Sequence, residues 1–541
     1  MSDLAGWLRT MRRAIARMRP LGVRLGLGRV PEGPAQPTRD PWPGDPARGA
    51  ALMRGNFDLA GGSLVLRPKG DSSGGFASIA GNPILLAGAH GFAWLRDLRA
   101  LGTDGARMRA RTLVGEWIAN AANMPDIAQR PDVAGSRIAA WLGHYDFFAA
   151  SADDGFRQRL MRQLMSDARA LSASLPTEEL DARALTAIKG LIAAAVALPD
   201  QAAFMSRALR VLPQELGRQI LADGTHCERS PAQQLAVLQD LTEIRALLQA
   251  GQITAPPALG SGIERTSLAL RMLRHGDGRL ALFNGTSDEA AALIELTLAQ
   301  AGRPGRAPAF LSEGGFHRLQ AERSVVIIDC GAPPGPKLDR LSHAGTLGFE
   351  MSIGRDRLIV NCGAMPAASS AWRDAGRATN AHSTLIIADT DSSELRDNGL
   401  GRYPAEVLAS RQEAQGAHWL DASHDGWMRP FGATHRRRLY LAASGEELLG
   451  EDTIEADSPQ PFVIRFHLHP DVDASLQHDG LAVLLRLAQG GFWRLEADGA
   501  AMSLEESIYL AGPAPRRSEQ VVLTGLMDGP QQVKWGIAKV G

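Results

Sequence analysis

The stretch RSVVIIDCG, residues 323–331, decides the fold, because it is the clearest of a series of strand-like runs that follows a long helical region. From about Ala309 onward the apolar residues change to the alternating spacing that is typical of strands. Similar runs occupy residues 347–363, 382–389, 434–443, 461–472, 481–499 and 520–540, and turns rich in Gly, Asp, Asn or Pro separate them. Regularly spaced strands without intervening helices predict an antiparallel β-sandwich.

The region before this change has the pattern of amphipathic helices. From about Pro131 to Gly302, apolar residues recur at i, i+3, i+4 and i+7. The strongest segments are residues 136–150, 156–175, 180–198 and 231–250, and short polar breaks separate the helices. Consecutive helices of similar length predict stacked antiparallel helix pairs. The spacing leaves open whether the array is an open solenoid or a closed α/α toroid.

Length and composition agree with a globular protein of more than one domain. The chain has 541 residues, of which 45% are hydrophobic and 22% are charged. The formal net charge of −1 argues against a surface built wholly for nucleic acid, but it is compatible with a local basic cleft for an acidic ligand. We therefore predict a helical domain followed by a β-domain, with a ligand site between them.

The first 30 residues contain many arginines, and these interrupt every apolar run. No uninterrupted apolar core of roughly 7–15 residues is present, so we predict no secretory signal. No run of roughly 18 apolar residues occurs anywhere, so we predict no transmembrane segment. A short basic amphipathic helix at the N-terminus would contact an anionic membrane surface, and a basic tail without structure is the alternative. The proline-rich residues 30–49 indicate a linker.

Several common kinds of site are excluded by their missing motifs. The chain has no GxSxG elbow, P-loop, GxGxxG fingerprint or HExxH helix. Its three cysteines, Cys227, Cys330 and Cys362, form no disulfide framework and no CxxC motif. Either all three are buried thiols, or Cys330 and Cys362 form one bridge.

A loop between two helical segments, residues 222–234, contains the first candidate site residues. Ser230 suits a helix N-cap and Pro231 suits the first helical position, so both have a structural explanation. His226 and Glu228 are not needed by the turn, and loops on a rigid scaffold are common places for function. His226 is therefore a functional candidate, with a structural role as the alternative.

The β-region contains further candidates. Asn380 and His382 precede the strand-like residues 384–389, and Trp427 lies shortly before the tandem arginines 436–438, which suit an anionic partner. Alternate side chains of a strand point to opposite faces. Arg436 and Arg438 should therefore share one face, and at least one face should be ordinary surface.

His467 and His469 are two residues apart, so they should lie on one face of their strand. Such a pair would hold a metal such as zinc only with a further ligand, for example His382 or Asp389, because zinc needs at least three protein ligands. Without that ligand, two histidines packed at a sheet edge are the better interpretation.

The motifs and their order resemble the heparinase II/III-like family of polysaccharide lyases. The resemblance begins near residue 80 and follows the change from helices to strands. It is clearest in DGTHCERSP (223–231), GDGRLALFNG (276–285), FHRLQAERSVVIIDCGAPP (316–334), AGTLGFEMSIGRDRLIVNCG (344–363) and RATNAHSTLIIADTDSSEL (377–395). It implies an α/α toroid, often incomplete, followed by an antiparallel β-sandwich.

The resemblance also implies a reaction, which is β-elimination on a uronic-acid-containing polysaccharide. Such a reaction requires neutralisation of the uronate carboxylate and a base within hydrogen-bond reach. By this resemblance His382 is the base or the carboxylate partner and His226 is the complementary acid or base. Tyr145 or Tyr403, or else His226 itself, would do the work of the tyrosine that is missing from its usual place. The residues expected to contact the substrate are Asn380, Arg377, Glu228, Arg438 and Trp427.

The chain departs from the family pattern at three places. Gln233 or Gln234 stands where a catalytic tyrosine is usual, and Lys189 with Gly190 stands where an Asn-His pair is usual. Thr384 stands where zinc-binding relatives have the second histidine of a His-x-His motif. These differences weaken the expectation of activity more than the expectation of fold.

We therefore predict a basic tail with a linker (residues 1–50), a toroid domain (51–305) and a β-sandwich domain (306–541). The predicted function is a lyase acting on an acidic polysaccharide, and the alternative is a catalytically impaired member that binds a glycan of the cell envelope. No cofactor beyond a divalent metal is expected, and no nucleic acid partner. The resemblance places the protein in the envelope or periplasm, whereas the lack of a signal sequence favours the cytoplasm.

Overall fold

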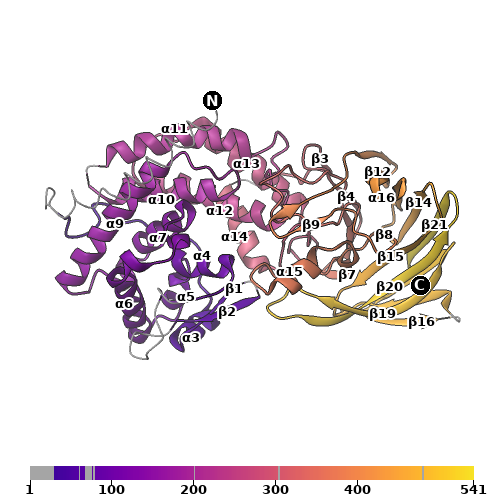
Figure 1. The fold of residues 1–541 in the computed structure, drawn as a ribbon, viewed down its shortest axis with the longest axis horizontal. Coiled ribbons are helices and arrows are strands. Elements are labelled where there is room, and N and C mark those ends of the chain that lie inside the picture. Colours follow the sequence, from indigo (N-terminus) through magenta and orange to yellow (C-terminus); the bar gives the residue numbers. More distant parts are fainter. Residues whose placement is uncertain are drawn as a thin grey trace.

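The computed structural model describes residues 30–59, 61–66, 76, 79–199, 201–302, 305–477 and 480–540. A helical domain and a β-domain follow each other along the longest axis of the molecule (Figure 1). The last helix of the first domain ends at Ala301, and the first strand of the second domain begins at Phe310. The predicted fold class, helical hairpins followed by a large antiparallel β-domain, is confirmed.

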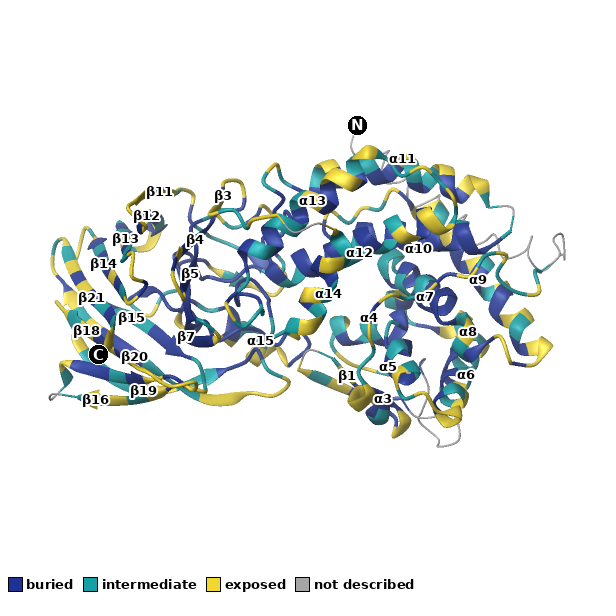
Figure 2. Cartoon of the chain, turned by 180° about the vertical axis from the view of Figure 1, so that it is seen from behind, coloured by how far each residue is buried: buried dark blue, intermediate teal, exposed yellow. Residues whose placement is uncertain are grey.

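The helical domain contains one short hairpin, β1 (Asn56–Leu59) with β2 (Gly62–Val65), in addition to its helices. The helices are α3 (Pro46–Met53), α4 (Pro83–Gly91), α5 (Leu95–Ala100), α6 (Asp104–Ala119), α7 (Pro131–Gly143), α8 (Tyr145–Phe148), α9 (Asp154–Ser174), α10 (Arg183–Ala197), α11 (Ala202–Gln219), α12 (Pro231–Ala250), α13 (Pro257–Met272) and α14 (Ala291–Ala301). Figure 2 shows α7 and α10 as mostly buried, whereas α9 and α11 expose one face.

Two local features explain how the inner helices form. Ser230 caps α12 by accepting a hydrogen bond from the backbone of Gln233, and Pro231 occupies the first helical position, as predicted. The middle of α10 packs closely on α7, since a Cβ atom added to Gly190 would lie 2.2 Å from the Cα atom of Gly135. Only glycine allows so close an approach of the two helix backbones.

The proline-rich segment before α3 lies against the helical domain rather than forming a free linker. The backbone N–H of Ala35 donates to Ala197 at the end of α10, and that of Asp40 donates to Gly143 at the end of α7. The indole of Trp42, which is 4% exposed, donates to Glu243 of α12. The segment therefore covers the C-terminal ends of these helices. The proposed membrane contact falls within residues 1–29, outside the described part of the chain.

In the described residues, the β-domain consists mainly of two large antiparallel sheets. One has the order β11 (Val407–Ala414), β12 (Ala417–Trp427), β13 (Ala433–Leu441), β14 (Glu447–Glu455), β21 (Gln531–Val540), β18 (Phe492–Asp498), β17 (Ala482–Arg486), β16 (Asp473–Gln477). The other has the order β19 (Ala501–Tyr509), β20 (Arg516–Met527), β15 (Gln460–Leu468), β7 (Asp356–Val360), β6 (Phe349–Ile353), β5 (Ser324–Asp329), β4 (Phe316–Ala321), β3 (Phe310–Leu311), and β8 (Leu385–Ile387) also pairs with β15.

The inner faces of the two sheets share one hydrophobic core. Phe349 of one sheet stacks on Trp535 of the other, with ring centroids 5.6 Å apart, and Phe466 contacts the same indole edge-on. Full burial of such a side chain stabilises the fold by about 2 kcal/mol. Cys227, Cys330 and Cys362 are buried free thiols, as the first of the two alternatives predicted.

A separate hydrophobic cluster joins the two domains. It packs Met272 and Leu273, at the end of α13, against Phe316, Val325 and Ile327 of β4 and β5. Arg229 crosses the same boundary, donating from Nε to Gly314 at 2.7 Å and forming an ion pair with Asp329. The loop before α12 is therefore held firmly against the β-domain.

Candidate functional site

The inner helices α7, α10 and α12 run in the same direction, and their N-terminal ends gather at the junction with the β-domain. The backbone N–H of Ala182, at the start of α10, donates to Glu228 Oε2 at 3.1 Å, just before α12. Burial would lower the pKa of Arg183 at the start of α10, but Asp181 outweighs it, with smaller contributions from Glu179 and from Asp132 in the first turn of α7. Helix N-termini carry partial positive charge, so this end of the bundle favours anions.

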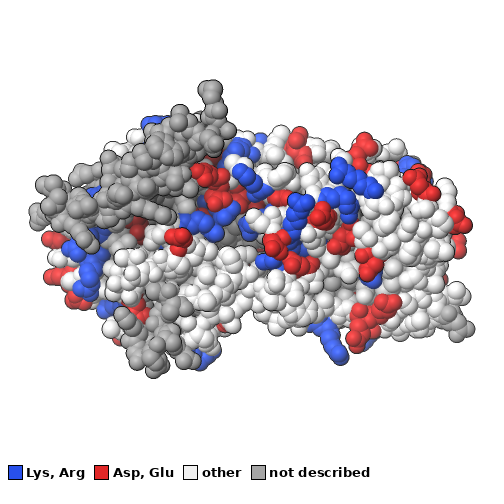
Figure 3. All heavy atoms as spheres, viewed as in Figure 1, with Lys and Arg blue, Asp and Glu red and all other residues white. Residues whose placement is uncertain are grey.

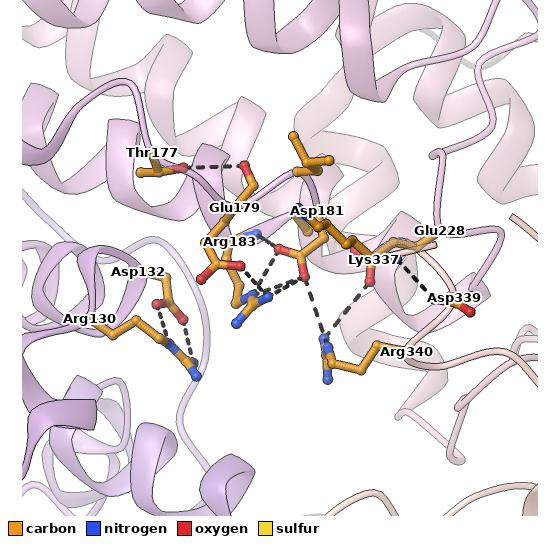
Figure 4. Close-up of polar contacts among 12 residues, drawn as sticks. Arg130, Asp132, Thr177, Glu179, Asp181, Arg183, Glu228, Lys337, Asp339 and Arg340 are labelled. Atoms are coloured by element: carbon orange, nitrogen blue, oxygen red, sulfur yellow. Dashed lines mark hydrogen bonds and ion pairs between the residues drawn. The ribbon is translucent and has the colours of Figure 1, made fainter. Parts of the chain in front are cut away.

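Charged side chains surround these helix starts and form the group that we call the junction cluster. Figure 4 shows Arg183 and Arg340 on either side of Asp181, and Arg340 also reaches toward Glu228. Figure 3 shows basic and acidic side chains next to each other where the two domains meet. The members of the cluster are Arg130, Asp132, Glu179, Asp181, Arg183, Glu228 and Arg340.

Two of the acidic groups, Asp181 and Glu228, lie at the base of the cluster, and the arginines reach solvent. The side chains of Asp181 and Glu228 are 1% exposed, whereas those of Arg183 and Arg340 are 25% and 28% exposed. Arg183 Nε donates to Asp181 Oδ1 at 2.9 Å. Arg340 lies 3.9 Å from Asp181 Oδ2 and 3.8 Å from Glu228 Oε1, too far for a hydrogen bond to either.

Burial and neighbouring charges shift the pKa values of Glu228 and Asp181 in opposite directions. Burial, together with the negative charge of Asp181, raises the pKa of Glu228 to about 7. Burial also disfavours the charged form of Asp181, but the hydrogen bond and charge of Arg183 outweigh it and lower the pKa of that carboxyl. Glu228 Oε1 and Arg340 Nε are both buried and have no hydrogen-bond partner. The cluster therefore has an acceptor and a donor left for a ligand.

His226 lies beside this cluster but is enclosed by protein. Its Nε2 lies 3.1 Å from Gln219 Oε1, and its Nδ1 lies 3.4 Å from the backbone nitrogen of Glu228. The amide oxygen of Gln219 accepts, so Nε2 carries the proton and Nδ1 faces an N–H donor. Burial lowers the pKa of His226 to about 4. The ring is neutral and fully partnered, and its catalytic role stays a prediction.

His382 is enclosed in the same way. The backbone N–H of Gly285 donates to His343 Nε2 at 2.8 Å, so His343 must donate from Nδ1 to His382 Nε2, 2.9 Å away. His382 then donates from Nδ1 to the carbonyl of Ala378 at 2.8 Å. Burial lowers the pKa of His382 to about 4. No ring nitrogen of His382 is free to accept a proton from a substrate in this arrangement.

The other residues expected near His382 have structural contacts. Arg377 is buried and donates to three backbone carbonyls, those of Ser342, Arg396 and Gly399. Trp427 is fully buried, and its indole donates to Thr390 at 2.7 Å. Asn380, in contrast, is exposed, and its backbone oxygen contacts His467.

The contacts that Tyr145 and Arg438 make are with residues outside the junction cluster. Tyr145, at the start of α8, packs against the core of the helical domain beside Gly33. Arg438 lies on the outward face of β13, paired with Asp421 at 3.4 Å and Glu451 at 3.0 Å. Arg436 shares that exposed face, as the strand spacing predicted.

The residues suggested for a metal do not fit a zinc site. Both ring nitrogens of His467 have protein partners, Ser507 Oγ at 2.8 Å and the Asn380 carbonyl at 2.9 Å. His469 lies outside β15, near Asp471. Within the described ranges, no three His, Cys, Asp or Glu side chains group closely enough to hold a metal ion. The histidine pair is better explained by packing at the end of its strand.

Comparison with known proteins gives the same family as the sequence motifs. Residues 303–536 match the family described as heparinase II/III-like, C-terminal. The chain is 33% identical over 543 residues to FtsZ-localized protein C of Caulobacter vibrioides (strain NA1000 / CB15N), covering 96% of this chain and 92% of that protein.

The chain belongs to the heparinase II/III-like family.

Solved structures of the family have the same fold. A crystal structure of heparinase III matches with a TM-score of 0.76 at 13% identity, over 92% of this chain and 84% of that one. The heparan sulfate lyase HepC from Pedobacter heparinus matches with a TM-score of 0.59 at 15% identity, over 91% and 82%. At this level of identity the match supports the fold, and the chemistry has to be argued from the residues.

The family departures seen in the sequence have structural explanations. Gln234, at one of the two positions where a tyrosine was expected, donates to Gly224 and Thr266 and accepts from the backbone of His226. Lys189, where an Asn-His pair was expected, is an ion-pair partner of Asp240 at 2.6 Å and Glu243 at 3.1 Å. These residues of the heparinase II/III-like chain support the helical domain.

The sequence did not identify Arg183, Asp181 or Arg340 as site residues. Asp181 and Arg183 stand at the start of a strong helical segment, and that position was a usable signal. Arg340 lies in an irregular loop, residues 331–347, whose path depends on both domains. No local pattern could have placed it beside Glu228.

No helix of the described residues is long and apolar enough to cross a membrane.

Proposed function

We propose that this heparinase II/III-like chain binds an acidic polysaccharide at the junction cluster. The observation that carries the proposal is the position of Arg340, 3.8 Å from Glu228 Oε1 and 3.9 Å from Asp181 Oδ2 without a hydrogen bond to either. Its guanidinium has donors available for a uronate carboxylate or another ligand oxyanion. Parallel helix N-termini beside it add to the attraction.

Binding without elimination is favoured by the histidines. Both predicted catalytic histidines, His226 and His382, are neutral and fully partnered. A base for β-elimination must reach the substrate proton directly or through one water. The proposal therefore follows the second of the two hypotheses from the sequence, a family member whose glycan site has lost its usual base.

A second candidate function, β-elimination with Glu228 as the base, has one observation in its favour. The pKa of Glu228 is raised to about 7, and its Oε1 has no hydrogen-bond partner. A base with a pKa near the working pH is efficient in proton transfer. Arg340 would then neutralise the uronate carboxylate.

The two candidates can be separated with one set of proteins. Purified chain is mixed with several uronate-containing polysaccharides, and both binding and the absorbance of unsaturated product are followed. We expect Arg340→Met to weaken binding about tenfold or more, because the variant loses a charge-assisted hydrogen bond to the ligand. Arg438→Ala is the matched control, because this arginine is paired on the outer sheet face.

The outcomes have different meanings. Equal binding by wild type and Arg340→Met would refute the junction cluster as the glycan site. A rise in absorbance that disappears in Glu228→Gln would establish the second candidate, and a rise that disappears only in His382→Ala would restore the prediction from the resemblance.

Because the chain is 33% identical to FtsZ-localized protein C, we also propose that it localises with FtsZ. A fluorescent fusion of the full chain should form bands or foci that coincide with labelled FtsZ. A uniform distribution of the fusion in cells that contain assembled FtsZ would contradict this.

A further inference from the structure

The junction cluster contains more carboxylates than arginines. Its members are three arginines and four acidic side chains, so with every group ionised its formal charge is −1. A negative charge weakens the binding of an anion, because like charges a few ångströms apart repel each other. One carboxylate of the cluster therefore opposes the ligand that the proposed function assigns to it.

Two of the three arginines already have carboxylate partners. Arg130 donates to both oxygens of Asp132, at 2.6 and 2.8 Å. Arg183 donates from Nε to both oxygens of Asp181 at 2.9 Å, and it also forms an ion pair with Glu179. Three of the four carboxylates are therefore hydrogen-bonded to an arginine.

In the described part of the chain, Glu228 is the carboxylate of the cluster without such a bond. Its Oε2 accepts from the backbone N–H of Ala182 at 3.1 Å, and its buried Oε1 accepts from no described group. Arg340 faces Oε1 at 3.8 Å (Figure 4), and Asp181 shares this arginine at 3.9 Å. A proton on Oε1 would remove the surplus charge without breaking a hydrogen bond.

The groups around Glu228 leave it as the one that changes charge near neutral pH. Burial raises the pKa of Glu228 to about 7, and the charge of Asp181 adds to this rise. His226 Nδ1 lies 3.7 Å from Glu228 Oε2, but burial lowers the pKa of this histidine to about 4, so its ring is neutral. Burial raises the pKa of Cys227 to about 12, so the thiol keeps its proton. The other charged groups that face Glu228 are Asp181, Arg183 and Arg340.

An anion bound at Arg340 acts on Glu228 in one direction. A ligand carboxylate that pairs with the guanidinium screens the positive charge facing Glu228 Oε1, and it adds a negative charge of its own. Both changes favour the protonated form of Glu228. Because such coupling is reciprocal, the protonated form must also bind the ligand more tightly.

We propose that anion binding at the junction cluster is coupled to uptake of a proton from solvent by Glu228, so that the site loses affinity for acidic ligands as the pH rises. The proton binds to Oε1, and the carboxylic acid then donates a hydrogen bond to the ligand oxygen that Arg340 holds. This inference rests on the proposed function, because it concerns the same site and the same class of ligand. Glu228 is then a proton-operated switch of that site.

The test is calorimetric titration of the full chain with a glucuronate-containing oligosaccharide at about pH 5.5 and about pH 8.5, where the ligand carboxylate is ionised throughout. We expect wild type to bind about tenfold more weakly at the higher pH, which corresponds to a shift of about one unit in the pKa of Glu228. Glu228→Gln keeps the cluster neutral. It should therefore match wild type at the lower pH and bind about tenfold more tightly than wild type at the higher pH. Glu264→Gln, at an exposed position of α13, is the matched control and should follow wild type.

Proton uptake is measured by repeating the titration at about pH 7.5 in two buffers that differ in ionisation enthalpy. Wild type should take up about half a proton per bound ligand, and Glu228→Gln should take up none. The gain of affinity expected for Glu228→Gln also excludes a damaged fold as its cause, because misfolding lowers affinity.

Three results would overturn the inference and leave the proposed function in place, provided that Arg340→Met still weakens binding. These are equal wild-type affinity at both pH values, the wild-type pH dependence in Glu228→Gln, and weaker binding by Glu228→Gln than by wild type at the higher pH. If the oligosaccharide binds at neither pH, the proposed function fails and this inference fails with it.

Discussion

The two ends of the bundle formed by α7, α10 and α12 differ in how far they are covered. At the N-terminal ends, Arg183 and, from a loop of the β-domain, Arg340 are about a quarter exposed and lie over buried carboxylates. At the C-terminal ends, residues 35–42 cross the helices and bond to their terminal carbonyls. Beneath that segment, Lys189 is paired with Asp240 and Glu243.

This difference shows that polar groups at one end of the bundle can stabilise the fold while those at the other end remain available to a ligand. At the covered end Lys189, Asp240 and Glu243 are paired with one another, so these charges support the fold. The open end has an arginine and a carboxylate oxygen without hydrogen bonds, so its polar groups are available to a ligand. Substitutions at the covered end should therefore lower stability, and substitutions at the open end should change ligand binding or the pH dependence of stability.

The largest effect is expected at the covered end, from Lys189→Met. Burial alone would lower the pKa of Lys189, but the carboxylates of Asp240 and Glu243 raise it, so the ammonium is charged in the fold. Removing it leaves two nearly buried carboxylates without their cation, which should destabilise the domain by about 3 kcal/mol. Thermal unfolding measures the loss.

Lys534→Met is the control for this change, because the Lys534 side chain is exposed and forms no hydrogen bond or ion pair among the described residues. Similar melting temperatures for Lys189→Met and Lys534→Met would mean that the covered end is not a stabilising network.

An intermediate effect is expected at the open end, from Glu228→Gln. The folded pKa of Glu228 is about 7, above its ordinary value of 4.5. Its contribution to stability is therefore present below about pH 4.5 and is lost as the pH rises through about 7. Glu228→Gln removes this dependence, so relative to wild type it should gain on the order of 2 kcal/mol between about pH 5 and about pH 8.

The measurement is the melting temperature of both proteins across that pH range. Glu264→Gln, at an exposed helical position, should follow the wild-type curve. If the difference between Glu228→Gln and wild type is the same at every pH, the buried carboxylate is not protonated near neutrality.

The smallest effect is expected outside the bundle, from Arg438→Ala. Its ion pairs with Asp421 and Glu451 are on the exposed sheet face, where such pairs contribute about 0–1 kcal/mol. Both stability and glycan binding should remain close to wild type. A clear loss of glycan binding would move the site from the open end of the bundle to the outer sheet.

The sequence predicted more of the fold than of the candidate site. The period of the apolar residues located α10, α12 and the long strands β13 and β15, because that period depends only on local geometry. Ser230 and Pro231 were placed correctly because a helix cap is also local. The family motifs directed attention to His382, but its environment depends on Gly285 and His343, which come from other segments.

The sequence by itself determined the order of the two domains, the kind of secondary structure in each and the shared face of Arg436 and Arg438. Local spacing is sufficient for these features. Only the tertiary structure decided that His226 and His382 are fully partnered, and that Arg340 stands beside Glu228. Hydrogen-bond saturation and burial depend on residues far apart in the chain, and these two quantities determine which polar groups remain available to a ligand.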